Sequence, residues 1–262
     1  MEKRRYPIRK PARQQQADMA FGVQSVLETL RSGKEVERVL IQRELSLSEV
    51  QKLAIERNVP VQRVPVEKLN RLTGKNHQGV ICFVSPIYYA PLHNVLAETF
   101  DQGQTPLFLI LDRITDVRNF GAICRTAECA GVQGIVVPQR GGAQINADAM
   151  KTSSGALNYL PISREEKLYE TLRYMKDSGL QLVACTEKAE ASLYDLDMSI
   201  PTAILMGSEE DGISPEFLRL ADHSVRIPIL GKVESLNVAA AAAVVLYEVV
   251  RQRAQPQYLY DQ

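Results

Sequence analysis

Five polar residues that have no evident part in a hydrophobic core follow apolar, strand-like runs in the second half of the sequence. They are Asn119, Arg125, Glu209, Ser235 and Asn237. Their amide, guanidinium, carboxylate and hydroxyl groups can bind and orient a polar ligand. Arg125 lies in the first half of a predicted helix, where its charge opposes the helix dipole, and this indicates a partner outside the helix. Because ligands bind outside the carboxyl ends of strands in open α/β sheets, these residues indicate one ligand site.

Glycines accompany these polar residues in four loops, each placed after a predicted strand. The loops are NFGAICR at 119–125, KTSSG at 151–155, GSEEDG at 207–212, and IPILG at 227–231 followed by SLN at 235–237. Each residue also has an ordinary structural explanation, since Asn119 and Ser235 suit helix N-caps and a glycine can serve a turn. Four such loops at one edge of a sheet favour a ligand site over four unrelated turns.

Several common catalytic patterns are missing from the sequence. There is no GxG and no GxxxxGK[ST], which argues against the usual dinucleotide-binding and ATP-hydrolysing folds. The three histidines lie outside the four loops, and the four cysteines include no CxxC pair. Neither a Ser-His-Asp site nor a metal site is therefore expected. Buried, reduced thiols are the expectation for the cysteines.

The distribution of charge and hydropathy narrows the class of partner. No run is long and apolar enough for a membrane span, and the basic N-terminus lacks the apolar stretch of a secretory signal, so a cytoplasmic protein is expected. Net charge is zero, but residues 1–86 carry sixteen Lys and Arg against nine Asp and Glu, a charge of +7 that residues 87–262 balance with −7. This asymmetry favours a polyanion as the partner of the first half, although an unevenly charged solvated surface explains it equally well.

The elements that must position the polar residues alternate between strand and helix. In the second half, apolar runs such as LFLILD and GIVV predict strands buried on both faces. The helices between them predict a parallel sheet with right-handed crossovers. Later strands are predicted at 181–185, 202–206 and 224–227, and helices at 121–129, 146–152, 165–178, 215–221 and 236–253.

The first half alternates helix and strand three times, which predicts a small α/β sandwich. Ser46 and Glu49 suit a capping box for its second helix. Composition divides the whole chain into four parts. They are a flexible basic arm at 1–17, the small α/β domain at 18–86, a linker at 87–104 and the larger α/β domain at 105–262.

Three segments of the second half, NFGAICR, MGSEEDG and IPILGKVESLNVAAAAAVVLYE, resemble the three signature motifs of the SpoU/TrmH family of RNA ribose 2′-O-methyltransferases, within the SPOUT superfamily. The first half, with NHQGV near its end, resembles the substrate-binding domain of the subfamily that includes the bacterial 23S rRNA guanosine 2′-O-methyltransferase. The resemblance implies a C-terminal parallel-sheet α/β domain with a deep trefoil knot and a small N-terminal α/β RNA-binding domain. It also implies a homodimer and an RNA partner, rRNA in particular, which fits the basic first half.

The same resemblance implies S-adenosylmethionine as the methyl donor, with no metal. By motif, backbone groups at Gly207, Ile227 and Leu236 would hold the donor, and the flanking Met206 and Leu230 would support it. A pocket built from backbone groups would also explain the glycines, since side chains there would block the adenine.

The resemblance further implies that Arg125 is the catalytic residue acting on the ribose 2′-hydroxyl. Asn119, Glu209, Ser235 and Asn237 would then place the reacting groups. Because an arginine stays protonated in proteins, we expect Arg125 to stabilise the developing alkoxide rather than to remove its proton.

One departure from the family pattern concerns the second motif, where Glu210 and Asp211 make the loop more acidic than the commoner GxEGxG form. Three other functions remain compatible with the sequence: a tRNA ribose methyltransferase, an enzyme that methylates a base, and a non-catalytic RNA-binding protein that retains the fold.

Overall fold

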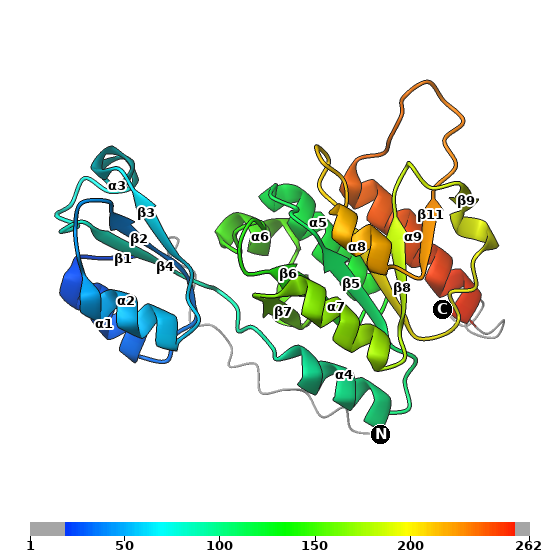
Figure 1. Cartoon of the computed structure of the whole chain (residues 1–262), viewed down its shortest axis with the longest axis horizontal. Helices are drawn as coiled ribbons and strands as arrows, with labels where there is room; N and C mark the ends of the chain where they lie inside the picture. The colour runs from blue at the N-terminus through cyan, green and yellow to red at the C-terminus, as the bar shows by residue number, and fades with distance from the viewer. Residues whose placement is uncertain (1–18, 255–262) are drawn as a thin grey trace. The chain divides into compact units, whose positions relative to one another are not determined.

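The computed structural model describes residues 19–254, which form two compact units (Figure 1). The first contains residues up to Tyr88 together with Gln144–Ala147, and the second contains Tyr89–Ala143 and the residues from Asp148 onward. Each unit has its own sheet and its own hydrophobic core. The predicted α/β class is confirmed for both. The arm predicted at 1–17 lies outside the described residues.

The N-terminal unit is built on a four-stranded mixed sheet with the strand order β1-β4-β2-β3. Strand β4 runs antiparallel to β1 and β2, and β2 runs parallel to β3. Side chains alternate across the sheet, so α1 and α2 cover the face that carries Val39, while α3 packs against Leu40 on the other. The elements are β1 (Met19–Phe21), α1 (Val23–Arg31), β2 (Val36–Gln42), α2 (Ser48–Glu56), β3 (Val61–Val64), α3 (Val66–Leu72) and β4 (Val80–Val84).

Two features of this unit differ from the sequence predictions. Strand β1 was not expected, because three residues are too short for an alternating pattern to stand out. The capping box at Ser46 is wrong: α2 begins at Ser48, and no side chain caps it. The Glu49 carboxylate instead accepts a hydrogen bond from Arg31 of α1 and joins the two helices.

The C-terminal unit is built on a seven-stranded sheet in the order β7-β6-β5-β10-β8-β11-β9, and every pair of neighbours is parallel. Its strands are β5 (Leu107–Leu111), β6 (Gly134–Pro138), β7 (Ile162–Glu165), β8 (Gln181–Cys185), β9 (Ala191–Ser192), β10 (Thr202–Met206) and β11 (His223–Arg226). The parallel sheet is confirmed, and the central strands β5 and β10 are buried throughout. The sequence did not predict β7 or β9.

Helices cover both faces of this sheet. They are α4 (Leu92–Asp101), α5 (Val117–Cys129), α6 (Ala147–Thr152), α7 (Leu168–Asp177), α8 (Pro215–Leu220) and α9 (Val238–Arg253). Apolar residues of α4, α7 and α8 share one core with β5 and β10, while α5 and α9 pack together behind the sheet (Figure 1). Helix α4 therefore belongs to this unit, although it lies inside the 87–104 segment. None of the helices between residues 19 and 254 is long and apolar enough to span a bilayer.

The direction of the chain reverses at β5. From β5 the sheet grows through β6 to β7, and the chain then returns to the other side to add β8, β10 and β11. The loops after β5 and β10 consequently leave the same edge side by side, and the Asp112 amide donates to the Met206 carbonyl across 2.8 Å. Such a reversal point is where open α/β sheets bind ligands. The trefoil knot stays a prediction.

Two helix starts also differ from expectation. Helix α5 begins at Val117, because the Asp116 carboxylate accepts hydrogen bonds at 2.8 Å from the backbone amides of Arg118 and Asn119. Helix α9 is capped by Asn237 and not by Ser235. Neither Asn119 nor Ser235 is an N-cap, so the ordinary structural explanation for each falls away.

The four cysteines are free and differ in exposure. Cys82 and Cys124 are buried, and burial raises the pKa of the Cys82 thiol to about 11. The expectation of four buried thiols is wrong for Cys129, which is exposed, and for Cys185, which is half-buried. Cys129 is the last residue of α5.

Gly121 lets α5 approach α6 closely. A Cβ at this position would lie 2.7 Å from the Thr152 Cβ and 3.1 Å from both the Ala149 carbonyl oxygen and the Ser153 amide nitrogen. Helix propensity alone would favour alanine by about 1 kcal/mol, but overpacking against backbone costs about 1–3 kcal/mol. We expect Gly121→Ala to lower the free energy of unfolding, measured by denaturant titration.

Gly142→Ala is the matched control for this prediction. Its Cβ would lie 3.6 Å or more from any neighbour, so the change should stay within about 0.5 kcal/mol. A Gly121→Ala protein as stable as the wild type would show that α5 and α6 are not tightly packed.

Candidate active site

Three of the predicted residues meet at the edge of the sheet. Asn119 comes from α5, Glu209 from the turn after β10, and Asn237 from the start of α9. The Asn119 Nδ2 donates to Glu209 Oε1 at 3.2 Å, and the Asn237 Nδ2 donates to the same oxygen at 2.8 Å. Asn237 Nδ2 also donates to Asn119 Oδ1 at 3.0 Å. We call Asn119, Glu209 and Asn237 the polar triad.

The triad is fixed by the N-terminus of α9. Asn237 Oδ1 accepts from the backbone amides of Ala239 at 3.0 Å and Ala240 at 3.4 Å, and Glu209 Oε1 accepts from the Val238 amide at 3.2 Å. The positive end of this sixteen-residue helix favours a negative charge at Glu209. One carboxylate oxygen therefore receives three donors from two separate helices.

The second carboxylate oxygen of Glu209 makes no hydrogen bond to any residue in 19–254, and the side chain is exposed. Glu209 Oε2 can therefore accept a hydrogen bond from a ligand hydroxyl. The triad presents a fixed acceptor at the surface, which is a means of orienting a hydroxyl group rather than of attacking a substrate covalently.

The backbone around Gly207 and Gly212 explains these two glycines without a ligand. The family motifs had suggested that glycine is needed there because a side chain would block the adenine of the methyl donor. Gly207 cannot carry a side chain, because its Cβ would overlap the backbone of Gly212 and Ile213. The chain turns back here, with the Gly212 amide donating to the Ser208 carbonyl at 3.0 Å and Gly212 in the left-handed region at φ 69°. Gly231 has open space around it. Close packing requires Gly207, the left-handed backbone favours glycine at position 212, and nothing in residues 19–254 requires Gly231.

Arg125 does not join the triad. Asn119 and Arg125 are six residues apart on α5, so they point roughly 120° apart around the helix axis. Arg125 is exposed, and its guanidinium makes no hydrogen bond or ion pair with any described residue. Arg118, seven residues earlier, shares this solvent-facing side of the helix, and its guanidinium is equally unpaired among residues 19–254. Two arginines are thus available to an anion from outside.

Ser235 lies in the exposed segment 227–236, between β11 and α9. No residue of this segment takes part in a hydrogen bond or an ion pair within the described chain. Leu230 is 99% exposed and Leu236 is 42% exposed, and Ile227 is half-buried. The structure therefore leaves Ser235, Leu230 and Leu236 exposed, while Ile227, the third predicted donor-binding position of this segment, is half-buried.

The remaining two predicted donor-binding positions, Met206 and Gly207, lie at the end of β10 and directly after it. Met206 is buried, and its carbonyl is bound to Asp112, while Gly207 is half-buried at the start of the turn. Neither of two shallow cavities in this unit, of about 360 and 330 Å³, includes any of the five donor-binding positions. Within residues 19–254, no three His, Cys, Asp or Glu side chains lie close enough to hold a metal ion.

The second glycine loop is not part of the triad. Ser153 is buried, and its hydroxyl donates to the Met150 carbonyl at 3.0 Å at the end of α6. Ser154 and Gly155 both have positive φ and form the turn that follows. This loop serves as a helix stop that faces α5 through Gly121.

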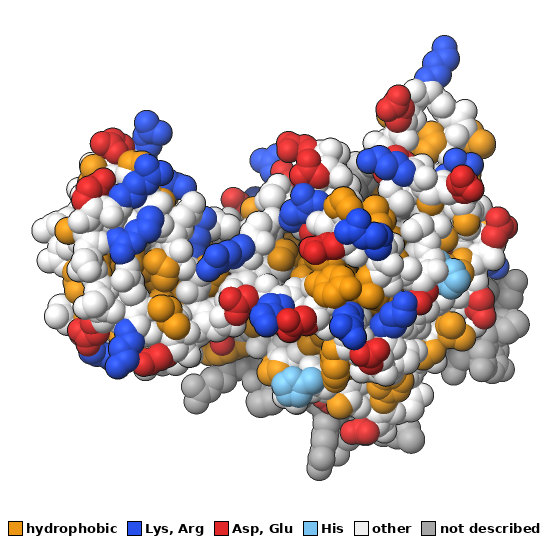
Figure 2. Space-filling model, viewed as in Figure 1, with side chains coloured by type: hydrophobic (Ala, Val, Ile, Leu, Met, Phe, Trp, Pro, Cys, Tyr) orange, Lys and Arg blue, Asp and Glu red, His pale blue; other side chains and the backbone are white. Residues whose placement is uncertain are grey.

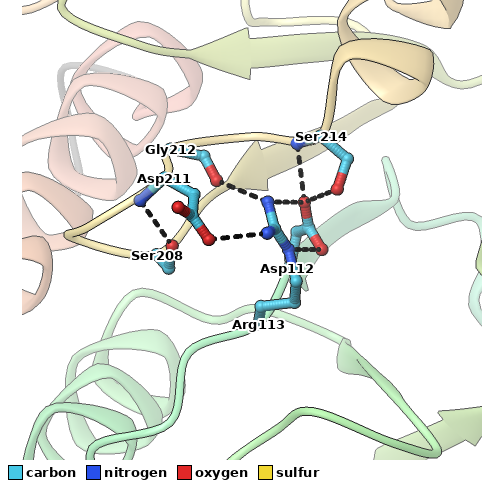
Figure 3. Close-up of polar contacts among 6 residues, drawn as sticks. All are labelled: Asp112, Arg113, Ser208, Asp211, Gly212 and Ser214. Carbon is cyan, nitrogen blue, oxygen red and sulfur yellow. Dashed lines mark hydrogen bonds and ion pairs between the residues drawn. The ribbon is translucent and has the colours of Figure 1, made fainter.

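Sequence reasoning missed a group that holds the turn bearing Glu209 (Figure 3). Asp112 is buried and accepts from both the amide and the hydroxyl of Ser214 at 2.7 Å. Arg113 donates to Asp112, to the Asp211 carboxylate and to the Gly212 carbonyl. The hydrogen bond to Asp112 raises the pKa of the Arg113 guanidinium. The sequence signal for this group was the pair Asp112 and Arg113, an acidic and a basic residue that directly follow the apolar strand β5.

The fold and the triad define the class of protein first: an α/β protein with a cluster of hydrogen-bonded polar side chains at the carboxyl edge of a parallel sheet. Residues 106–247 match the SpoU rRNA Methylase family, and residues 19–90 match the RNA 2′-O ribose methyltransferase substrate binding domain. The first match covers more than half of the chain. The chain therefore belongs to the SpoU/TrmH family of RNA methyltransferases, as the three motifs predicted.

Individual relatives agree with this assignment. The chain is 33% identical over 242 residues to the Bacillus subtilis protein YacO, which is named for the TrmH family of tRNA/rRNA methyltransferases; the match covers 91% of this chain and 97% of that protein. It resembles the SpoU methyltransferase AviRb from Streptomyces viridochromogenes, solved with AdoMet, at a TM-score of 0.57, 27% identity and 90% coverage of each chain. An AdoMet-bound rRNA methyltransferase from Sinorhizobium meliloti gives a TM-score of 0.59 and 27% identity, covering 90% of this chain and 88% of that one.

Two variants of Asn237 separate its capping role from its role in the triad. Asn237→Ala loses both, and the missing cap should lower the free energy of unfolding by about 1 kcal/mol. Asn237→Asp keeps the cap but sets a second carboxylate beside Glu209, so we expect it to lower the free energy of unfolding at pH 7 through charge repulsion, and Glu209→Gln in the same chain to regain most of that loss. Denaturant titrations of the single and double variants measure this.

Ser235→Ala is the control, since Ser235 has no hydrogen bond within residues 19–254 and its change should stay within about 0.5 kcal/mol. A double variant no more stable than Asn237→Asp would mean that residue 237 does not touch Glu209.

Proposed function

We propose that this chain transfers the methyl group of S-adenosylmethionine to a ribose 2′-hydroxyl of RNA, and that the nucleotide is a guanosine of 23S rRNA. The polar triad carries the proposal, because it provides a fixed acceptor for a hydroxyl group beside the sheet edge where the family motifs meet. The choice of rRNA is supported by the family assignment of residues 106–247 and by the basic first half.

The residues at the sheet edge fit this methyl donor. The segment 227–236 has backbone N–H and C=O groups that are not bonded within the described chain, and these can bind the polar edge of an adenine. Leu230 and Leu236 expose apolar side chains that can cover its faces. Contact with a ligand would satisfy both. Ile227, Gly207 and Met206 complete the proposed donor-binding positions.

S-adenosylmethionine, when bound, supplies the methyl group from its sulfonium sulfur. The rest of the donor then leaves as a neutral thioether. The chain must then align the hydroxyl and stabilise the negative charge that develops on the ribose oxygen. Glu209 Oε2, held by Asn119 and Asn237, orients the ribose. Arg125 stabilises the alkoxide and binds the neighbouring phosphate, which accepts the proton. Ser235, exposed near the start of α9, positions the ribose from the other side.

The N-terminal unit binds the RNA in this proposal. Figure 2 shows several Lys and Arg side chains on the visible face of this unit, with Asp and Glu side chains among them. Contacts of this kind neutralise phosphates and make affinity fall with salt. They supply affinity and register, while the chemistry belongs to the C-terminal unit.

Mapping ribose methylation tests the function. RNA from cells with and without this protein should differ at one 2′-O-methylated guanosine of 23S rRNA, and the purified protein should restore it. The modified linkage resists alkali, so hydrolysis should release one resistant dinucleotide. A methylated mononucleotide would show base methylation instead, a modified tRNA would move the target, and no donor binding by calorimetry would leave a non-catalytic RNA-binding protein.

Arg125→Lys tests the proposed role of the guanidinium. Lysine keeps the charge but loses the planar pair of donors, so we expect kcat to fall about 100-fold. The dissociation constant of the donor should change by less than about twofold, because Arg125 lies outside the donor-binding positions. Single-turnover rates and calorimetry measure the two quantities. Near-full turnover would remove Arg125 from catalysis.

We also propose that the enzyme is a homodimer in which Arg125 of one protomer reaches the triad of the other. Within one chain, Arg125 points away from Asn119. The helix α9, which packs beside α5, exposes a stripe of Ala240, Val244 and Tyr247 at helical spacing, with Tyr247 51% exposed. An exposed apolar stripe of this kind can pack against a second protomer.

Mixing two inactive variants tests the shared site. Arg125→Ala and Glu209→Ala should each lack activity, but an equal mixture that exchanges subunits should regain about a quarter of the wild-type rate. The reason is that half of the dimers are then mixed, and each of these has one intact site. A mixture that stays inactive while sedimentation shows mixed dimers would place Arg125 and Glu209 of one site in the same chain.

A further inference from the structure

We propose that Arg113 is a positioning residue that sets the place of Glu209 by clamping the turn 208–212. The proposal rests on the proposed function, in which Glu209 orients the ribose. Arg113 is the second residue after β5, and Glu209 is the third residue after the neighbouring strand β10. Figure 3 shows the Arg113 side chain directed at the far side of this turn, toward Asp211 and Gly212.

The backbone of Arg113 adopts a conformation that an arginine rarely takes. Its φ is 58°, in the left-handed region, where non-glycine residues are uncommon and cost about 1 kcal/mol or more. Glycine would adopt it freely. The contacts of the Arg113 side chain must therefore outweigh this cost. They are all made with Asp112 or with the turn 208–212.

The base of the clamp is a buried charge. Asp112 is only 2% exposed, and a buried carboxylate is stable only if its hydrogen-bonding capacity is met. Ser214 donates to it twice at 2.7 Å, and Arg113 Nε donates at 3.2 Å. The guanidinium is thus held flat against Asp112, at the end of the most buried strand pair of the sheet.

The other two nitrogens of Arg113 reach the turn itself. One donates to the Asp211 carboxylate at 2.9 Å, and the other to the Gly212 carbonyl at 3.1 Å. Asp211 is 68% exposed, so the ion pair alone contributes little. The carbonyl bond is directional and holds the closing residue of the turn. Arg113 also neutralises part of the acidity that distinguishes this loop from GxEGxG.

The turn transmits this restraint to the triad. The Asp211 amide donates to the Ser208 hydroxyl at 3.1 Å, so the ends of the turn and Glu209 between them move as one piece. Glu209 then determines whether the Val238 amide has its acceptor. Since a misplacement of about 1 Å can lower a rate about 100-fold, a free turn would weaken the alignment of the ribose.

Amide hydrogen exchange in the protein without RNA or donor tests the clamp. In Arg113→Gly, which relieves the backbone strain, the Val238 amide should exchange about tenfold faster than in the wild type. Glu209→Ala, which removes the acceptor, gives the full effect for comparison. Arg113→Lys keeps a charge beside Asp112 but cannot bridge Asp112, Asp211 and Gly212 together, so it should lie between. Unchanged exchange at Val238 in both Arg113 variants would overturn the proposal.

Lys176→Ala is the matched control. Lys176 likewise joins an aspartate, Asp222 at 2.6 Å, to a backbone carbonyl, that of Leu220 at 3.2 Å, but far from the triad in the chain. It should lower stability and leave the Val238 exchange within about twofold. Equal acceleration in Lys176→Ala and Arg113→Gly would overturn the proposal, because general loosening would then explain both.

Kinetics add the catalytic readout. Arg113→Gly should lower kcat about tenfold while the KM for the donor changes by less than about twofold, since Arg113 touches none of the donor-binding positions. A tenfold rise in the KM for the donor with a normal kcat would contradict the proposal that Arg113 positions Glu209. If the wild type methylates no ribose, the proposed function fails, and the exchange experiment still decides the clamp, because it needs neither RNA nor donor.

Discussion

One carboxylate oxygen, Glu209 Oε1, joins three segments of the chain that are more than twenty-five residues apart. It accepts hydrogen bonds from Asn119, Asn237 and the Val238 amide, so α5, the β10 turn and α9 meet at a single atom. Removing the carboxylate would leave the Asn119 side-chain amide and the Val238 backbone amide without their acceptor, and the Asn237 side-chain amide nitrogen with only its bond to Asn119. The geometry of the candidate active site therefore depends on where the turn after β10 places this residue.

Close packing at two glycines determines the position of the turn after β10. The turn can fold back onto β10 because Gly207 has no side chain, and α5 can lie against α6 because Gly121 has none. The pairing of β5 with β10 brings Asp112 and Arg113 beside the turn, where a buried charge and a strained arginine hold it from the other side. Strain, close backbone contact and a buried charge converge on a short stretch of the sheet edge, and such features commonly cluster at functional sites.

Other parts of the site are exposed, and in the proposed function they contact the RNA, the methyl donor or a second protomer. Arg118 and Arg125 point outward from α5, and the segment 227–236 exposes leucines and unbonded backbone groups. These features have no structural explanation inside one chain, and each suits one requirement of the proposed reaction. The arginines suit a phosphate, the segment suits a methyl donor, and the exposed side of α9 suits a second protomer. The triad is preformed in the single chain, and in the proposed function its surroundings are completed by binding.

The sequence by itself determined the two α/β units, the parallel sheet and the family, because buried strands, glycine turns and the motifs are local patterns. It also identified Asn119, Glu209 and Asn237 as polar residues that a core does not need. Their meeting at one oxygen, the caps at Asp116 and Asn237, and the clamp of Asp112 and Arg113 were decided only by the tertiary structure. The reason is physical: strand order sets which loops are neighbours, and the β5–β10 pairing joins residues about a hundred positions apart, which no local pattern records.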